Sequence, residues 1–319
     1  AYAEDEMRLN NHMSANIGAS LTATIVSGRT YLMLDPRFAL KWQLANSTSI
    51  KMSYTHMSQS IHRMASSFLE LPTDFWVPTT NEIKPTMSHQ IAAGIYTQPS
   101  KHLTLSLEAY YKLSSHLLQY RHWMGFQPSA ATWSRDVADG KGKSYGLEAD
   151  ATYTTGTTTL SMAYTLSWSR RLFKDIHPTW FDDQFDNRHK INVSLSHDFS
   201  PRISLYAAWT FHSGNRVTMP VGYTIQPNIP GDYGYSYDYI FDHPNNYSLP
   251  AYHRLDIGAN FRHTTRHGRE GIWNVSLYNA YCHLNTMYVK VRLDDNNNFH
   301  LKSYGYIPII PSVSYTLKF

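Results

Sequence analysis

Apolar and polar residues alternate along most of this chain with a period of two. In residues 103–111, Leu, Leu, Leu, Ala and Tyr alternate with Thr, Ser, Glu and Tyr. A period of two places successive side chains on opposite faces of a β-strand. Convincing 3.6-residue periodicity is almost absent, so the pattern predicts an all-β fold.

The alternation, together with the turn signals between runs, predicts about twelve full strands. They are expected near 12–26, 29–45, 48–63, 86–97, 102–121, 143–154, 157–172, 188–199, 202–218, 251–265, 271–291 and 299–319. Several are much longer than the usual strand of about five or six residues. Such lengths are enough for a tilted strand to cross a bilayer, which takes about 9–11 residues.

The predicted connections differ in length on the two sides of the sheet. Short turns are expected at 46–48, 98–100, 155–156, 200–201 and 266–269, and long loops at about 64–85, 122–142, 173–187 and 219–250, with a shorter one at 292–298. Short turns on one side and long loops on the other are typical of an outer-membrane β-barrel, with apolar side chains toward lipid and polar ones toward the lumen. A soluble sandwich has no reason to sort its loops in this way.

Composition narrows the class of protein further. Charged residues make up 16% of the 319 residues and aromatic residues 14%, whereas about 25% charged residues is usual. The mean hydropathy is −0.43, and no apolar run approaches the roughly 18 residues of a transmembrane helix. A net charge of +4 without a basic stripe argues against nucleic acid, and the single cysteine, Cys282, excludes an intrachain disulfide and a cysteine metal site.

The first residues read as the end of a strand. Residues 2–9 are expected to descend and turn at Asn10-Asn11 before the first full strand begins. The other part of that strand is not in the sequence. We therefore expect the chain to be a piece of a larger protein.

Several segments, in this order and spacing, resemble TonB-dependent outer-membrane receptors, and the Bacteroidetes group of these transporters in particular. They are Tyr-Ala-Glu-Asp-Glu at 2–6, Asp-Pro-Arg-Phe-Ala-Leu at 35–40, Leu-Pro-Thr-Asp-Phe-Trp-Val-Pro at 71–78, Gly-Lys-Ser-Tyr-Gly-Leu-Glu at 142–148, Phe-Asp-Asn-Arg-His-Lys-Ile-Asn at 185–192, Leu-Pro-Ala-Tyr-His-Arg-Leu-Asp at 249–256 and Trp-Asn-Val-Ser-Leu-Tyr-Asn-Ala-Tyr at 273–281. The resemblance covers essentially the whole chain.

The resemblance implies a 22-stranded barrel filled by an N-terminal plug. Residues 1–319 would be the C-terminal part of the barrel domain, with about 12–13 strands present and the plug absent. Such receptors sit in the outer membrane of Gram-negative bacteria and import an iron chelate, cobalamin, a glycan or a peptide. Their partners would be membrane lipid, the TonB complex acting through the missing N-terminal region, and a surface lipoprotein; no cofactor and no catalytic residue is expected.

The last strand carries a second implied feature. Val313, Tyr315, Leu317 and Phe319 alternate with polar residues, and the chain ends on the aromatic ring. Tyr315, Leu317 and Phe319 would form the signal read by the barrel-assembly machinery. Ser314 stands where such signals usually have glycine.

Aromatic residues in the expected outer loops are the candidate ligand contacts. Faces of aromatic rings with hydroxyl tips suit stacking on sugars, chelates or peptides. The candidates are Trp76, Trp123, Trp133, Trp180, Tyr233, Tyr235, Tyr237 and Tyr239. The alternative is that these rings pack the loops together or form an aromatic girdle.

Other candidate chemistry is weaker. Asp182, Asp183 and Asp186 could supply oxygen ligands to calcium, but the spacing is not that of an EF-hand and a solvated acidic loop is the simpler interpretation. Glu108 and Glu148 are expected to point into the lumen, where carboxylates usually pair with cations or water rather than catalyse.

Two other functions remain open from the sequence. A self-contained twelve-stranded barrel, acting as a translocator or a rim hydrolase, requires residues 12–26 to pair with 299–319. A secreted glycan-binding β-sandwich requires solubility without detergent.

Overall fold

The computed structural model describes residues 1–64, 75–121, 133–227, 235–294 and 299–319. These residues form 22 β-strands and one short 3₁₀ helix, η1 (Trp133–Arg135). Among them, no helix is both long enough and apolar enough to span a bilayer. The all-β prediction is confirmed.

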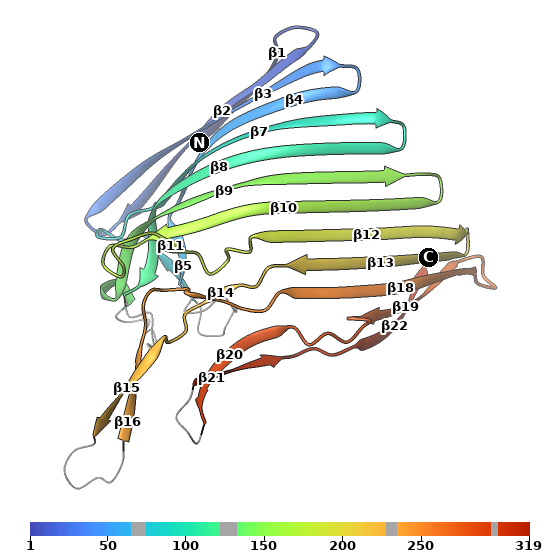
Figure 1. Ribbon diagram of the computed structural model, residues 1–319. Coiled ribbons are helices and arrows are strands. Elements are labelled where there is room, and N and C mark those ends of the chain that lie inside the picture. The colour runs from blue at the N-terminus through green and yellow to red at the C-terminus, as the bar shows by residue number, and fades with distance from the viewer. Residues whose placement is uncertain (65–74, 122–132, 228–234, 295–298) are drawn as a thin grey trace.

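One antiparallel sheet organises the molecule (Figure 1). It has 14 strands, and β11 (Phe181–Asp182) is attached to its side at β10. The strands along its path are β1 (Tyr2–Arg8), β2 (Met13–Val26), β3 (Arg29–Ala45), β4 (Thr48–Gln59), β7 (Thr86–Ser100), β8 (Leu103–Tyr120), β9 (Val137–Thr154), β10 (Thr158–Leu172), β12 (His189–Ser200), β13 (Ile203–His212), β18 (Tyr252–Thr264), β19 (Glu270–Tyr278) and β22 (Ile310–Lys318).

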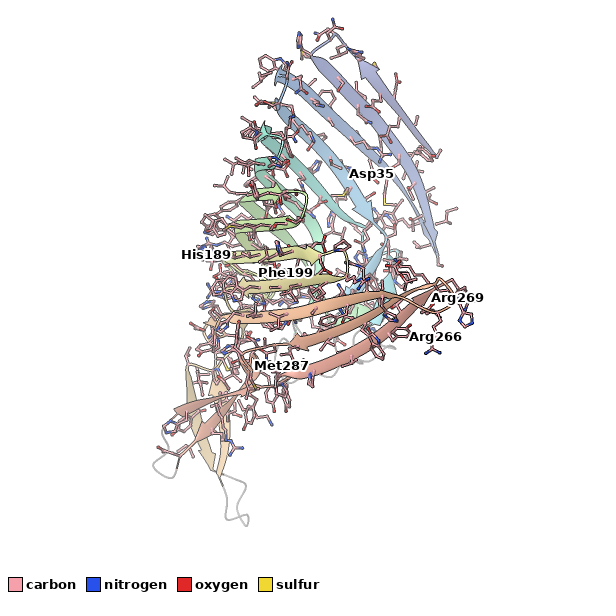
Figure 2. All side chains as sticks on the ribbon, turned by 90° about the vertical axis from the view of Figure 1, so that its right-hand side faces the viewer. Asp35, His189, Phe199, Arg266, Arg269 and Met287 are labelled. Carbon is pink, nitrogen blue, oxygen red and sulfur yellow. The ribbon has the colours of Figure 1, made fainter. Side chains whose placement is uncertain are left out.

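The strands of the sheet pair in sequence order, and the sheet curves along that order (Figures 1 and 2). β1 and β22 are its two ends, and β2 pairs with β1 and β3 rather than with β22. This pairing contradicts the self-contained barrel, which requires residues 12–26 to bond to 299–319.

The two faces of the sheet differ in chemistry as the alternation predicts. On one face, large apolar side chains stay exposed, among them Leu32 at 72%, Ile91 at 57% and Leu107 at 50%. On the other face, polar side chains lie across from one another, as Glu108 does from Glu148. A sheet that leaves its apolar face uncovered suits a lipid environment rather than water.

The buried core is small and lies beside the long connections instead of under the sheet. One cluster contains Met64, Val77, Ile83, Tyr120 and Val137, and a second contains Ala138, Phe173 and Phe181. Both clusters use residues at strand ends and in loops. They order the long connections at one end of the sheet.

The alternation of short and long connections is confirmed, with one exception. Residues 27–28 join β2 to β3 on the long side by a tight turn in which Gly28 has a φ of +81°. Glycine tolerates this left-handed backbone without strain. On the short side, the β18–β19 turn holds Arg266 and Arg269, while Met287 lies toward the opposite end of the strands (Figure 2).

Four predicted strands are wrong in extent because the chain leaves the main sheet within them: the predicted strand 48–63 leaves it after Gln59, and three others do so further on. The stretch 202–218 ends its main strand at His212, and 271–291 and 299–319 divide into sheet strands and a separate hairpin, β20 (Thr286–Leu293) with β21 (Phe299–Gly305). Asn279, Cys282 and Ile307 adopt positive φ at the points of division. Non-glycine residues rarely adopt this conformation, so nothing in the alternation signals the break.

Further short strands form within the long connections. They are β5 (Ile61–Met64) with β6 (Phe75–Pro78), β14 (Arg216–Val217) with β17 (Tyr247–Ser248), and β15 (Gly222–Pro227) with β16 (Tyr235–Ile240). The sequence interpretation placed β6, β15, β16 and β17 in loops, whereas β5 and β14 lie almost wholly within the predicted strands 48–63 and 202–218. They lie at the left-hand ends of the main strands in Figure 1, where β15 and β16 project downward, away from the sheet.

Candidate functional site

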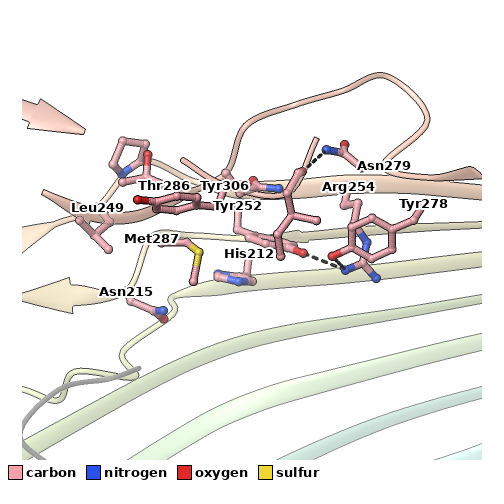
Figure 3. Close-up of a pocket in the computed structure, with 13 residues that line it drawn as sticks. His212, Asn215, Leu249, Tyr252, Arg254, Tyr278, Asn279, Thr286, Met287 and Tyr306 are labelled. Atoms are coloured by element: carbon pink, nitrogen blue, oxygen red, sulfur yellow. Dashed lines mark hydrogen bonds between the residues drawn. The ribbon is translucent and has the colours of Figure 1, made fainter. Parts of the chain in front are cut away.

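A cavity of about 320 Å³ opens at the long-connection end of β13, β18 and β19 (Figure 3). It is lined by His212, Asn215, Leu249, Pro250, Tyr252, Arg254, Tyr278, Asn279, Asn285, Thr286, Met287, Tyr306 and Ile307. Tyr252, Arg254 and Tyr278 belong to the polar face of the sheet, since Leu255 and Leu277 lie on the apolar one. The cavity therefore faces the concave, lumen-like side.

Flat rings form one wall of this cavity. The rings of His212 and Tyr252 are parallel within 3°, with centroids 4.8 Å apart. Tyr278 and Tyr306 add two further rings, and Met287 adds a polarisable sulfur. Rings in this arrangement suit a planar or ring-bearing ligand, because ring faces gain stacking energy in addition to burial of area.

Arg254 holds the polar edge of the cavity in place. Its guanidinium donates to the hydroxyls of Tyr252 at 3.0 Å and Tyr278 at 2.5 Å, and its carbon lies 4.1 Å from the centre of the Tyr278 ring. Asp256 accepts two bonds from the same guanidinium, at 3.0 and 2.8 Å. The cation is thus neutralised locally, and two oriented phenol oxygens are what a ligand meets.

Asn279 closes the back of the cavity. It is 1% exposed, and its backbone N–H donates to Asp256 at 2.9 Å. Its amide group donates to the carbonyls of His283 and Ile307, at 2.9 and 3.0 Å. These bonds satisfy the positive-φ turn and tie the segments that flank β20 and β21 to the sheet.

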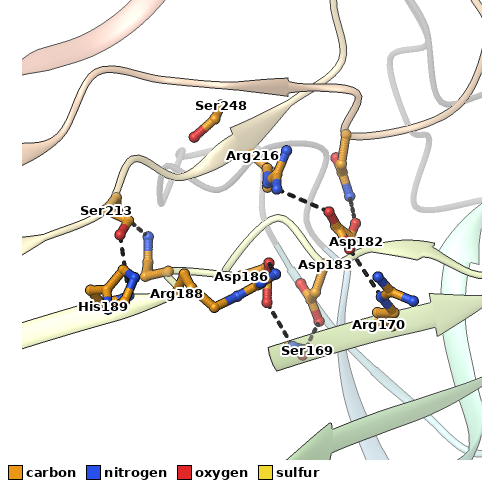
Figure 4. Close-up of polar contacts among 12 residues, drawn as sticks. Ser169, Arg170, Asp182, Asp183, Asp186, Arg188, His189, Ser213, Arg216 and Ser248 are labelled. Atoms are coloured by element: carbon orange, nitrogen blue, oxygen red, sulfur yellow. Dashed lines mark hydrogen bonds and ion pairs between the residues drawn. The ribbon is translucent and has the colours of Figure 1, made fainter. Parts of the chain in front are cut away.

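A set of aspartate–arginine pairs supports the neighbouring loops (Figure 4). Asp182 contacts Arg170 at 3.3 Å and Arg216 at 3.0 Å. Asp183 pairs with Arg171 at 2.6 Å, and Asp186 pairs with Arg188 at 2.8 Å.

The interpretation of this segment as a solvated acidic loop is therefore wrong for Asp183 and Asp186, whereas the Asp182 side chain is 23% exposed. The carboxylates of Asp183 and Asp186 are buried rather than solvated. Their oxygens already accept bonds from arginine and from the backbone, so they are committed to structure and not to calcium. Within the described part of the chain, no three metal-binding side chains come together.

This network reaches the cavity through asparagine. Asn187 follows Asp186, is 5% exposed, and donates its amide to Asn215 Oδ1 at 2.6 Å. Asn215 lines the cavity. The loop between β10 and β12 is therefore coupled by hydrogen bonds to the cavity wall.

The sequence-predicted aromatic residues lie elsewhere. Trp76 is 63% exposed on β6, Trp133 packs against the first buried cluster, and Trp180 lies under the ammonium of Lys143, whose nitrogen is 4.4 Å from the ring centre. Tyr235, Tyr237 and Tyr239 belong to β16, and Tyr239 is 44% exposed. Trp123 and Tyr233 fall outside the described residues. Trp76, Trp133, Trp180 and Tyr239 do not line the cavity. The role of the predicted aromatic residues as ligand contacts stays a prediction.

Part of the cavity could have been predicted from the sequence. Tyr252, Arg254 and Asp256 lie in one of the segments that carry the family resemblance, and their alternation places them on the polar face. The sequence-predicted aromatic residues lie in the expected loops, whereas His212, Tyr252 and Tyr278 lie at strand ends.

The residues of the expected assembly signal lie on β22 or follow it. Tyr315 packs on Trp273 with ring centroids 4.7 Å apart, Leu317 pairs with Gly271, and Phe319 is fully exposed. Their role in assembly stays a prediction. The lumenal Glu108, across from Glu148, accepts a hydrogen bond from the Tyr96 hydroxyl at 2.5 Å.

The curved antiparallel sheet, its outward apolar face and its sorted connections are those of part of the wall of an outer-membrane β-barrel. The family model described as "TonB dependent receptor-like, beta-barrel" matches residues 1–281. The chain therefore belongs to this family, as the sequence resemblance implies; the Bacteroidetes grouping stays a prediction. Among curated proteins, no sequence match was found.

Solved receptors share the fold at low sequence identity. The ferric yersiniabactin uptake receptor of Yersinia pestis is 11% identical with a TM-score of 0.66, and 100% of this chain covers 45% of that one. The ferripyoverdine receptor of Pseudomonas aeruginosa is 13% identical (TM-score 0.61; 98% and 37% covered), and the ferric-catecholate import receptor of Escherichia coli K12 is 12% identical (TM-score 0.60; 99% and 44% covered). The chain thus spans less than half the length of these receptors.

Proposed function

We propose that the chain is the C-terminal part, residues 1–319, of an outer-membrane receptor that binds an iron chelate on the cell surface and imports it. The rest of the 22-stranded barrel, the plug and the TonB-contacting motif would come from the remainder of the protein. Energy for import would come through TonB. Iron is cargo in this proposal, and the chain needs no cofactor.

The observation that carries this proposal is the ring-walled cavity on the lumenal face at the long-connection end. If the long connections are extracellular, the cavity opens where a ligand arriving from outside first enters the barrel. Its parallel rings and oriented phenol oxygens match ligands that present flat rings or carbonyl oxygens. The solved receptors described above are named for ferric yersiniabactin, ferripyoverdine and ferric catecholate, which supports iron chelates over cobalamin, glycans or peptides.

The experiment is uptake of radioactive iron by iron-starved cells carrying the complete receptor. A panel of ferric siderophores would be offered to the wild type, to Tyr252→Ala and to Tyr153→Ala. Tyr252 stacks in the cavity, whereas Tyr153 lies 44% exposed on the apolar face near the short-turn end, so it is a matched control.

We expect one siderophore class to be taken up, uptake to stop when TonB is removed, and Tyr252→Ala alone to reduce the apparent affinity at least tenfold. Uptake of cobalamin, oligosaccharide or peptide in place of every iron chelate would contradict the ligand class. Uptake that continues without TonB would contradict the energised mechanism. A surface lipoprotein that co-purifies with the receptor would add the expected partner.

A further inference from the structure

The apolar, outward face of the sheet is hollowed near its short-turn end. A groove of about 800 Å³ crosses β12, β13, β18 and β19 on the face opposite to the ring-walled cavity. Its volume lies within the range of ligand sites, roughly 300–1,000 Å³. The name outer groove is used below for this hollow, whose lining includes Leu195, Phe199, Ala207, Ala259, Phe261 and Leu277.

Two small residues among large ones produce the hollow. In the register of the strands, Ala207 lies between Leu195 and Ile257, and Ala259 is the next outward residue after Ile257 on β18. Ala207 and Ala259 are therefore diagonal neighbours on one face of the sheet. A methyl group at both positions leaves a trough between the larger apolar side chains around it.

The lining of the outer groove suits hydrocarbon. Among the described residues that line it, none is aspartate, glutamate, lysine or arginine. Phe199, at its short-turn end, is 64% exposed. A hydrocarbon chain in the groove would cover this apolar surface without leaving any polar group unsatisfied.

The turns next to the outer groove carry positive charge. Arg202 follows the β12–β13 turn, and Arg266 and Arg269 lie in the β18–β19 turn. Both turns join strands that line the groove, and all three arginines are exposed. Figure 2 looks onto this end of the sheet, with Phe199, Arg266 and Arg269 labelled.

These three arginines keep their charge available. The carboxylates nearest to them in the sequence are used elsewhere, since Asp198 pairs with Arg262 at 3.8 Å and Glu270 pairs with Lys318 at 3.0 Å. In the described part of the chain, no carboxylate lies within 4 Å of any of the three turn arginines. A guanidinium without a carboxylate partner suits a phosphate, which it can bind through two parallel hydrogen bonds.

The order of these features along the strands is that of a phospholipid. In outer-membrane barrels the short turns face the periplasm, so the outer groove lies at the level of the inner leaflet and the turn arginines at the level of its headgroups. Basic side chains at that level attract anionic headgroups. Apolar groove and positive turns therefore complement the two ends of one amphipathic molecule.

We propose that the outer groove and the three turn arginines form a binding site for one anionic phospholipid of the inner leaflet. One acyl chain fills the groove over Ala207 and Ala259, and the phosphate lies against Arg202, Arg266 and Arg269. This inference goes beyond the proposed iron-chelate function and does not depend on it, because the site uses the opposite face of the sheet. The bound lipid bridges the β12–β13 and β18–β19 turns.

The test uses the complete receptor, purified in detergent and incubated with equal amounts of two lipids with the same palmitoyl and oleoyl chains. One is phosphatidylglycerol, which is anionic, and the other is phosphatidylethanolamine, which has no net charge. Native mass spectrometry counts the molecules of each lipid that stay bound. One variant, Arg202→Gln with Arg266→Gln, removes headgroup contacts, and a second, Ala259→Trp, fills the groove.

Each variant has a matched control. Arg8→Gln with Lys101→Gln removes two exposed positive charges beside other short turns. Ala149→Trp adds the same ring to the outward face of β9, as far in residues from the short-turn end of its strand as Ala259 is on β18. Melting followed by circular dichroism checks that every variant is folded. Because the two variants alter different parts of the site, either one tests it if the other does not fold.

We expect the wild type to retain one phosphatidylglycerol with about a tenfold preference over phosphatidylethanolamine. Each variant should retain about tenfold less phosphatidylglycerol, and each control should change less than twofold. Equal retention of the two lipids by the wild type would overturn the anionic site. So would an arginine variant that matches Arg8→Gln with Lys101→Gln, or an Ala259→Trp protein that matches Ala149→Trp.

Discussion

Asp186 offers the sharpest test of how the loops around the cavity are held. Its carboxylate is 1% exposed; one oxygen accepts the Ser169 N–H at 2.7 Å and the other accepts from Arg188 at 2.8 Å. In Asp186→Ala both donors lose their acceptor. Breaking a fully buried ion pair costs about 3–5 kcal/mol.

The Arg188 side chain is 31% exposed, so water can replace part of what it loses. We therefore expect a smaller local cost of about 2 kcal/mol, or roughly a 30-fold rise in the opening equilibrium of the β10–β12 loop. Hydrogen exchange of peptides covering residues 169–188, measured on the complete receptor by mass spectrometry, reports that equilibrium. Exchange in the strands of the main sheet should change little.

The control is Asp198→Ala, which removes an exposed pair with Arg262 at 3.8 Å and should cost under about 0.5 kcal/mol. An exchange rise of less than threefold in Asp186→Ala would refute the reasoning. So would an equal rise in Asp198→Ala, since burial would then have no bearing on the strength of the pair.

Three further predictions concern single residues. Gly214→Ala would place Cβ 1.6 Å from the Leu249 carbonyl oxygen, a backbone atom that no rotamer change can move. We expect at least tenfold weaker ligand binding and less receptor in the outer membrane by immunoblot. Normal ligand binding together with a normal amount of receptor would contradict this prediction. Burial of the His62 ring lowers its pKa from 6.5. The β5–β6 hairpin should therefore be fully stable above about pH 6.5 and should lose stability as the pH falls below that value. Hydrogen exchange of the hairpin amides, corrected for the pH dependence of the intrinsic exchange rate, should show this loss, and His62→Gln should remove it. Phe319→Ala, at a fully exposed position, should reduce receptor insertion without changing ligand affinity in the inserted fraction; unchanged insertion would argue against its place in an assembly signal.

The strand predictions succeeded where a local pattern was sufficient. The ranges predicted near 29–45 and 157–172 lie within one residue of β3 (Arg29–Ala45) and β10 (Thr158–Leu172). Side-chain direction in a strand follows from position alone, so the outward face could be identified without knowing any partner strand. The same reasoning failed at Asn279, where the chain turns and the side-chain amide donates to the carbonyls of His283, 4 positions away, and Ile307, 28 positions away.

The charged loop shows a second limit. Asp183 and Asp186 are close in sequence and suggested a solvated or calcium-binding segment. Their arginine partners include Arg171, on a neighbouring strand end 12 positions away from Asp183. A carboxylate with a buried partner and one in water have the same sequence signature, because burial depends on which segments the sheet brings together.

The sequence by itself determined the all-β class, the positions of the main strands, their outward faces and the side on which the long connections lie. These follow from a period of two and from turn residues, which act over a few positions. The tertiary structure alone decided that His212, Tyr252, Tyr278 and Tyr306 share one cavity. Those residues meet because β13, β18 and β19 pair in register and β21 returns beside them, and strand pairing over such sequence distances is set by the whole sheet.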